Sequence, residues 1–301
     1  MSDRDEYYNR AKVEGYRSRA AYKLKQLDEA ADLFADGDTV VDLGAAPGGW
    51  LQVAAERVGG DGRVVGVDFQ SIDSVDRPAD VVTLRGDMTE AATGERIRAA
   101  LAGADEAARN AVDASHRESP LVGDSGTDQP DEAGTDDASA DGEPHDATAD
   151  VVVSDMAPDL TGEYSVDHAR SVHLARQALD TALAVLAPGG DFVVKVFDGQ
   201  DLRAFVEDVE AEFEYAREVR PDASRDASSE LYVVGKGRLT APVRTGDVLT
   251  VTVTDEGSEG DGVASVDGYT LFVAGAEPGE ELAVEVTGVK PRFGFAEPVP
   301  E

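Results

Sequence analysis

The segment Thr39–Trp50, with the sequence TVVDLGAAPGGW, constrains the fold more than any other part of the chain. Its apolar first half is typical of a strand buried on both faces, and a helical pattern begins at Gly48, so the segment predicts a strand, a tight loop and a helix. Gly44 and Gly48 let the backbone approach a ligand where a Cβ atom would collide. Asp42, at the end of the strand, can accept hydrogen bonds from an amine or from loop amides.

The spacing of the glycines and of the next acid indicates the kind of ligand. A dinucleotide pyrophosphate is typically held by G-x-G-x-x-G, but an Ala-Ala-Pro segment separates Gly44 from the glycine pair, which disfavours a pyrophosphate. A turn without a ligand is the simpler alternative. However, residues 63–67 predict a second strand that ends at Asp68, 20 residues after Gly48, where an acid can bind both hydroxyls of a ribose. Together these features favour a cofactor that contains a nucleoside.

A third acid, Asp87, follows shortly after a third predicted strand at residues 81–84. Asp87 could hydrogen-bond an adenine amine, or it could cap the helix that we expect from about Thr89. Because the two preceding strands also end in acids, both interpretations stay open.

The chain is strongly acidic, with 27 Lys and Arg against 62 Asp and Glu and a formal net charge of −35. This balance normally argues against nucleic acid, whose phosphates bind Lys and Arg. It is also typical of a halophilic protein, because a Debye length of about 3 Å at 1 M salt screens the self-repulsion. The few cations are therefore informative. Six of them favour contact with a polyanion: Arg10, Lys12, Arg17, Arg19, Lys23 and Lys25.

Cysteine is absent, which excludes disulfides and thiolate metal sites. No apolar run approaches the roughly 20 residues needed to span a membrane, and the charged N-terminal segment is unlike a signal peptide. We expect a soluble, cytoplasmic monomer with no membrane contact and no metal ion.

The apolar pattern disappears from about residue 105 to 149. Asp, Glu, Ser, Thr, Gly and Ala dominate there, with almost no large apolar side chain past Leu121. Such a segment cannot bury enough surface to offset the entropy lost on ordering. We expect a disordered acidic insertion that contributes no catalytic group.

The rest of the pattern predicts two folded parts. Strands alternate with helices between residues 39 and 213, and two closely spaced strands follow at 214–220 and 230–235. This order predicts a parallel α/β sheet completed by an antiparallel hairpin. Beyond Gly237 only short alternating segments remain, separated by glycine-rich turns, as expected for a small β-barrel.

The end of the predicted barrel places cations beside aromatic rings. Lys290 and Arg292 directly precede Phe293, and Phe295 follows. Aromatic rings next to cations suit stacking on unpaired bases. Packing inside the barrel explains the phenylalanines equally well.

A lysine interrupts one of the most apolar predicted strands. The strand is FVVKVF, residues 192–197, and Lys195 is its only charged side chain. A lysine in such a strand is costly unless it is paired or takes part in chemistry. Lys195 is therefore a candidate functional residue.

Five stretches resemble one family: SRAAYKL at 18–24, DLGAAPGGW at 42–50, SDMAP at 154–158, FVVKVF at 192–197 and SSELYVV at 228–234. In this order they resemble the FtsJ/RlmE family of ribosomal RNA 2′-O-methyltransferases, over most of residues 7–236. The tail is similar, through a looser motif, to the TRAM domain, an OB-like RNA-binding barrel. The resemblance implies a Rossmann-like methyltransferase domain at 1–236 and a TRAM-like barrel at 237–301.

The resemblance also implies an activity. The implied reaction is methylation by S-adenosylmethionine of a ribose 2′-hydroxyl, which we expect on a uridine, in 23S ribosomal RNA. The implied partner is ribosomal RNA or the large ribosomal subunit. The family's catalytic residues correspond to Lys23, Asp155, Lys195 and Glu230. Its cofactor contacts correspond to Gly48, Trp50, Asp68, Asp87 and Asp155, to which the loop argument adds Asp42 and Gly44.

The chemistry of these residues suits methyl transfer to a hydroxyl, which requires an in-line approach and a group that accepts or orients the hydroxyl proton. An amine in an apolar strand beside a second cation can serve, so Lys195 with Lys23 nearby is the candidate. Asp155 and Glu230 would position the lysines and the hydroxyl.

Other interpretations remain open. The charged residues could form an ion-pair network without chemistry. A nicotinamide-dependent oxidoreductase would share Asp68 and the sheet, but the dinucleotide glycine pattern is missing. A non-catalytic RNA-binding module would keep the basic segment and the barrel without needing Lys195. A 2′-O-methyltransferase could also act on another RNA, such as tRNA.

Overall fold

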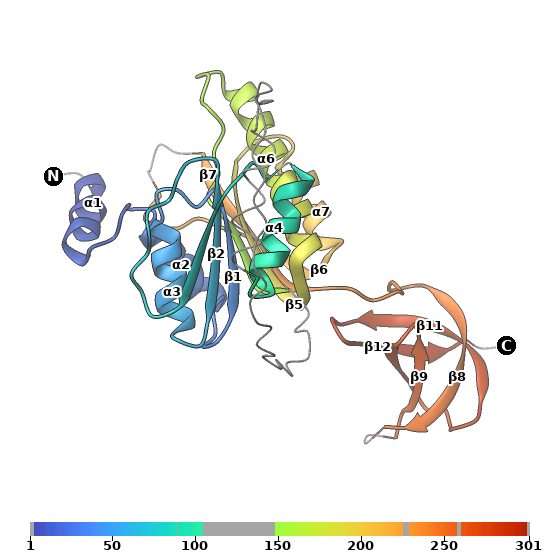
Figure 1. Cartoon of the computed structure of the whole chain (residues 1–301). Coiled ribbons are helices and arrows are strands. Elements are labelled where there is room, and N and C mark those ends of the chain that lie inside the picture. Colours follow the sequence, from blue (N-terminus) through green and yellow to red (C-terminus); the bar gives the residue numbers. More distant parts are fainter. Residues whose placement is uncertain (1–2, 89, 105–147, 225–228, 258–259, 300–301) are drawn as a thin grey trace, which may run out of the picture.

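A computed structural model describes residues 3–88, 90–104, 148–224, 229–257 and 260–299. The larger part of the fold is a seven-stranded sheet in the order β3-β2-β1-β4-β5-β7-β6, and the C-terminal part is a closed five-stranded barrel (Figure 1). The predicted fold class, an α/β sheet followed by a small all-β barrel, is confirmed. Among the described residues, none of the helices is long and apolar enough to cross a membrane.

The sheet comprises β1 (Thr39–Leu43), β2 (Arg63–Asp68), β3 (Asp80–Arg85), β4 (Ala149–Ser154), β5 (Leu186–Phe197), β6 (Phe213–Val219) and β7 (Glu230–Arg238). The strands from β3 to β5 are parallel to their neighbours, whereas β7 is antiparallel to β5 and β6. The chain order reverses at β1, which lies between β2 and β4. Ligands of open α/β sheets bind at the carboxyl ends of the strands at such a reversal, so this edge is where a site is expected.

Helices cover both faces of the sheet (Figure 1). They are α2 (Ala21–Ala31), α3 (Gly49–Val58), α4 (Ala91–Leu101), α6 (Tyr164–Val185) and α7 (Leu202–Glu210), whereas α1 (Asp3–Glu14) packs on α2 and not on the sheet. On one face α2 and α3 bury Leu24 and Trp50 against Tyr232 of β7. On the other face α4, α6 and α7 share a larger core that includes Ile97 and Phe205. The strands can serve both cores because successive side chains point to opposite faces.

Some element boundaries differ from the predictions where strand pairing takes precedence. The helix expected over 201–213 ends at Glu210, because Phe213 begins β6 and pairs with Arg238 of β7. β7 therefore continues beyond Gly235, where the predicted strand ended. Backbone hydrogen bonds to a neighbouring strand decide these ends, and they are not visible in local patterns.

The predicted acidic insertion lies almost entirely outside the described residues. Residues 105–147 belong to that part of the chain. Ala149, which the prediction included in the insertion, is already the first residue of β4 and is fully buried.

The barrel comprises β8 (Val248–Glu256), β9 (Gly262–Val266), β10 (Tyr269–Val273), β11 (Glu281–Val289) and β12 (Phe293–Pro298). Alternate residues such as Val251, Val253 and Val284 fill its interior. The sequence predicted the first four strands, and parallel pairing of β12 with β10 closes the barrel. Lys290 Nζ contacts Glu214 Oε2 of the sheet domain at 2.7 Å.

Candidate active site

Strand register brings three of the predicted residues to one edge of the sheet. The parallel pairing of β4 with β5 places Asp155, just past the end of β4, beside Lys195. Lys195 lies directly opposite Tyr232 of β7. Glu230 is two residues from Tyr232 along β7 and therefore points to the same face, the one that α2 and α3 cover. Charged groups that are far apart in the sequence thus share one face.

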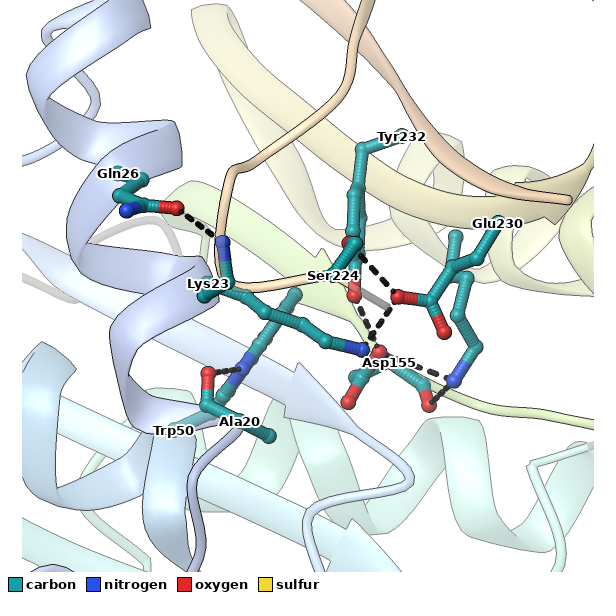
Figure 2. Close-up of polar contacts among 10 residues, drawn as sticks. Ala20, Lys23, Gln26, Trp50, Asp155, Ser224, Glu230 and Tyr232 are labelled. Atoms are coloured by element: carbon teal, nitrogen blue, oxygen red, sulfur yellow. Dashed lines mark hydrogen bonds and ion pairs between the residues drawn. The ribbon is translucent and has the colours of Figure 1, made fainter. Parts of the chain in front are cut away.

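Lys23 enters the same group from α2. Its Nζ donates a hydrogen bond to Glu230 Oε1 and lies 5.9 Å from the centre of the Tyr232 ring. Figure 2 shows Lys23 directed from α2 toward Glu230, with Asp155 close by. Lys23 is buried because its helix packs its apolar face on the sheet, which leaves the amine inside the site. The structure therefore brings together all four predicted catalytic residues.

Asp155 is held by two donors on one oxygen. Lys195 Nζ lies 2.9 Å from Asp155 Oδ1 and also donates to the Asp155 carbonyl oxygen. The Tyr232 hydroxyl donates to the same Oδ1 at 2.7 Å (Figure 2). Burial, with Asp155 and Glu230 nearby, raises the pKa of Tyr232 well above its usual range, so the hydroxyl keeps its proton. Within the described residues Asp155 Oδ2 accepts no hydrogen bond, which leaves this oxygen available to a bound molecule.

Two residues of this network have no assigned role in the sequence analysis. Tyr232 stands in the SSELYVV motif, and its position two residues after Glu230 was the available signal. Ser224 Oγ donates to Glu230 Oε1 at 3.1 Å. Its loop is fixed on α2 by a 2.9 Å hydrogen bond from the Ala223 N–H to Gln26 Oε1 (Figure 2). Ser224 gave no signal, because only folding brings its loop to α2.

The glycines of the loop between β1 and α3 are required sterically. A Cβ atom on Gly44 would lie 2.3 Å from Met156 Cγ, and one on Gly48 would lie 2.6 Å from Arg17 Nη1. Both glycines also have positive φ, 79° and 103°. Glycine meets both requirements, a positive φ and no Cβ atom, at low cost. It therefore allows the loop to pass close to the Asp155 segment.

Asp68 stands where the sequence places it, at the end of β2, and it already organises the backbone. Its Oδ2 accepts the Ala46 N–H at 3.0 Å, and its Oδ1 accepts the Gln70 N–H at 2.8 Å. Each carboxylate oxygen has a second lone pair, so these bonds leave acceptor capacity for a ribose.

Trp50 lies in the core instead of lining an open surface. Its ring is 5.8 Å from the Tyr232 ring, and its Nε1–H donates to the Ala20 carbonyl oxygen at 2.8 Å. The backbone of Trp50 lies in the first turn of α3, where N–H groups have no intrahelical acceptor and suit a ligand. Any contact of Trp50 with a cofactor would therefore use its backbone.

Asp87 lies two residues beyond β3, at the same edge of the sheet. The residue that precedes α4 is Glu90, and its side chain does not cap the helix. The helix begins at Ala91, slightly later than expected, and the Asp87 carbonyl oxygen accepts the Glu90 N–H at 3.1 Å. Capping by the Asp87 side chain and its contact with an adenine both stay predictions.

Asp42 is the least satisfied acid of the site. Its side chain is 1% exposed, and neither oxygen accepts a hydrogen bond from a described residue. Burial, and then Asp155 and Asp68, raise the pKa of Asp42 well above its usual range. Three carboxylates thus converge at the ends of β1, β2 and β4. Such a group attracts a cationic ligand and repels a pyrophosphate, so it fits the sulfonium and ammonium of S-adenosylmethionine.

Several of the predicted polyanion contacts have partners inside the fold. Lys25 contacts Glu14 at 3.8 Å and lies 4.3 Å from the Tyr16 ring centre, and Arg10 contacts Glu14 at 3.6 Å. Arg17 donates to backbone carbonyl oxygens. Polyanion binding by this segment stays a prediction. Among the described residues, no group of three or more His, Asp or Glu side chains is placed to hold a metal ion.

Comparison with known proteins gives consistent matches. The FtsJ-like methyltransferase family matches residues 16–238, and the TRAM domain family matches residues 242–299. A protein named ribosomal RNA large subunit methyltransferase E from Natronomonas pharaonis is 58% identical over 99% of both chains. A protein of the same name from Halorubrum lacusprofundi is 57% identical over 98% of this chain and 94% of its own.

A solved structure supports the fold. It is described as a ribosomal RNA methyltransferase from Plasmodium falciparum, and it has a TM-score of 0.52 and 19% identity. It covers 74% of this chain and 98% of its own. The resemblance inferred from the motifs is confirmed: the chain belongs to the FtsJ-like methyltransferase family and carries a C-terminal TRAM domain.

Proposed function

We propose that the protein methylates the 2′-hydroxyl of a ribose in 23S ribosomal RNA, with S-adenosylmethionine as methyl donor, and that the nucleotide is a uridine. The observation that carries this proposal is the convergence of Lys23, Asp155, Lys195 and Glu230 beside the glycine-rich loop. The names of the haloarchaeal relatives support the large-subunit RNA as substrate. A substrate in the ribosome also supports a cytoplasmic location.

The cofactor would lie along the carboxyl ends of β1, β2 and β4. When bound, S-adenosylmethionine supplies an electrophilic methyl group. Asp68 would accept hydrogen bonds from its ribose, and Gly44 and Gly48 would allow close approach of the backbone. The buried oxygens of Asp42 and the available Oδ2 of Asp155 would face its cationic groups. Asp87 would accept a hydrogen bond from the adenine amine.

The residues of the site would orient the ribose hydroxyl and handle its proton. Lys195 has three N–H directions, and two of them are used on Asp155. In the ammonium form the third N–H would hold the hydroxyl oxygen in line with the methyl group, and in the neutral amine the lone pair in this direction would accept the hydroxyl proton. Lys195 would accept or steer the hydroxyl proton, with Asp155 fixing its position. Glu230, to which Ser224 donates, would hold Lys23.

The barrel would add RNA affinity. Phe272, Phe293 and Phe295 form a group with ring centres 5.6–6.1 Å apart. Phe293 and Phe295 are 38% and 43% exposed, so packing inside the barrel, the alternative from the sequence, does not explain them. Exposed aromatic rings beside Lys290 and Arg292 suit stacking on unpaired bases.

Methyl transfer from labelled S-adenosylmethionine to deproteinised 23S RNA, large subunits or tRNA tests the proposal. We expect the label in the large-subunit RNA. When this RNA is digested to nucleotides, the label should be recovered in a 2′-O-methylated nucleotide. Lys236→Ala is the matched control for Lys195→Ala, because Lys236 forms an ion pair with Asp191 at the other end of the sheet. RNA binding without any transfer would favour the non-catalytic module, and transfer to tRNA alone would change the substrate.

A second measurement tests the barrel. Phe293→Ala with Phe295→Ala should weaken RNA binding by roughly 10-fold or more, because stacking on one base contributes about 1–3 kcal/mol. Affinity for the cofactor should not change. Equal RNA affinity of the parent and this variant would exclude the phenylalanines as RNA contacts.

A further inference from the structure

Arg17 lies outside the catalytic group, yet its side chain joins two loops that border the proposed cofactor site. Its Nη1 donates to the Pro47 carbonyl oxygen at 3.2 Å and to the Asp73 carbonyl oxygen at 2.9 Å, and its Nη2 donates to the Ser74 carbonyl oxygen at 2.5 Å. Pro47 belongs to the loop between β1 and α3. Asp73 and Ser74 belong to the loop between β2 and β3. One guanidinium therefore links the two loops.

The backbone of Arg17 is itself fixed to α3. The Arg17 N–H donates to Gln52 Oε1 at 2.8 Å, and Gln52 Nε2 donates to the Gly15 carbonyl oxygen at 3.0 Å. Gln52 is a buried polar side chain with both ends of its amide hydrogen-bonded. The guanidinium thus extends from a rigid base, which lowers the entropy lost when it orders the loops.

Gly48 shows how closely the three segments meet. A Cβ atom at Gly48 would lie 2.6 Å from Arg17 Nη1 and 3.5 Å from Ile72 Cγ2. The absence of a side chain at Gly48 therefore makes room for the guanidinium, in addition to allowing the positive φ. Asp68 completes the arrangement, because it accepts N–H groups from Ala46 of the first loop and from Gln70 of the second.

We propose that Arg17 is a positioning residue for the cofactor and not an RNA contact. Its planar fork has several N–H donors in fixed directions, which suits carbonyl oxygens from two separate loops. It holds the glycine-rich loop and the loop after Asp68 at the separation that the nucleoside of the cofactor requires. This inference rests on the proposed function, since it concerns the same site.

The test compares the full-length parent with Arg17→Ala, Arg17→Lys and the control Arg10→Ala, all in molar KCl. Arg10 belongs to the same basic segment but contacts Glu14 and the Tyr22 ring. Calorimetry with S-adenosylhomocysteine should show affinity about 10- to 100-fold weaker for Arg17→Ala, because hydrogen bonds from a charged donor are lost. Arg17→Lys should recover little of it, since one ammonium cannot reproduce the fork. Arg10→Ala should bind like the parent.

Two further readouts separate positioning from general stability and from RNA binding. In Arg17→Ala, hydrogen exchange should increase in both loops together, residues 44–48 and 69–78. The KM for S-adenosylmethionine should rise, while kcat at saturating cofactor stays within a few-fold of the parent. RNA affinity, measured by filter binding without cofactor, should be unchanged.

The contrary results are distinct. Unchanged affinity for S-adenosylhomocysteine in Arg17→Ala, with only a lower melting temperature, would overturn the inference and leave the proposed function intact. Weaker RNA binding with unchanged cofactor affinity would make Arg17 an RNA contact and would also overturn it. If the parent itself binds neither S-adenosylhomocysteine nor S-adenosylmethionine, the proposed function fails first and the inference fails with it.

Discussion

The sheet holds two largely buried lysine–aspartate pairs, one at each end, and they differ in what remains unsatisfied around them. Near the amino ends of the central parallel strands, Asp191 of β5 accepts Lys236 Nζ on one oxygen and the Gly237 N–H, at 3.0 Å, on the other. Lys236 also donates to the Asp32 carbonyl oxygen at 2.9 Å. Both carboxylate oxygens of Asp191 therefore have a donor, and the pair fixes the end of β7 to the sheet.

In the pair at the carboxyl end, one carboxylate oxygen lacks a donor among the described residues. Lys195 and Tyr232 both donate to one oxygen of Asp155, and the other oxygen accepts no hydrogen bond from a described residue. Asp42, in the same cluster of acids, is buried with both oxygens lacking a donor among the described residues. A buried polar group without a partner is costly, so it indicates a ligand. The ion pair alone does not distinguish the two ends of the sheet; the unsatisfied acceptors do.

The largest expected effect is on the rate of methyl transfer. Lys195→Ala should lower the single-turnover rate about 10²–10⁴-fold at saturating RNA and cofactor, because proton handling is lost. Lys195→Arg should be nearly as slow, since a guanidinium cannot act as a base. Lys236→Ala should stay within a few-fold of the parent. A Lys195→Ala rate near that of the parent would move the role to another residue, with Asp155 next.

Substitutions at the two ends of the sheet should also differ in their effect on cofactor affinity, by a smaller factor than on the rate. Asp68→Ala should weaken binding of S-adenosylhomocysteine by roughly 10- to 100-fold, because a charge-assisted acceptor of the ribose is removed. Asp191→Ala should leave the dissociation constant unchanged. Calorimetry decides between these outcomes, and an unchanged constant for Asp68→Ala would limit Asp68 to organising the loops.

Stability should depend more on the Lys236–Asp191 pair than on the Lys195–Asp155 pair. Lys236→Ala leaves the buried Asp191 without its cation and should destabilise the fold by about 1–3 kcal/mol. That loss corresponds to about 2–4 °C in melting temperature for each kcal/mol in a domain of this size. Thermal melts in molar KCl should rank Lys236→Ala below Lys195→Ala. The reverse order would mean that the carboxyl-end pair is the structural one.

The smallest effect concerns the pH dependence of stability. Burial raises the pKa of Asp42 above its ordinary value of 3.8, because the folded state favours the protonated carboxyl group. Its contribution to stability is therefore fully present below pH 3.8 and is lost as pH rises through the raised pKa. Parent stability should therefore fall relative to Asp42→Asn, which stays neutral, as pH increases from about 4 toward 8. Melts of the two proteins in parallel test this. A constant difference across the range would mean that Asp42 is satisfied by a partner.

Much of the fold was predictable because local patterns carry it. Alternation of strands and helices, the glycine-rich loop and the late change to short alternating segments gave the α/β sheet and the barrel. The ends of α7 and β7 and the fifth barrel strand were missed, because hydrogen bonds between distant strands set them. The six clustered cations were interpreted together as a polyanion contact, yet Lys23 and Arg17 are used within the domain.

The sequence alone determined which groups are present at strand ends and that Lys195, in an apolar strand, needs a partner or a function. Motifs of sufficient length also identified Lys23, Asp155 and Glu230 through the family resemblance. Only the tertiary structure decided that Tyr232 and Ser224 hold this group, that Trp50 is in the core, and that Arg17 joins two loops. The physical reason is that hydrogen bonds and burial depend on register and on packing between distant segments, such as those of Lys23 and Glu230, which are 207 residues apart. A local pattern records only the preferences of neighbouring residues.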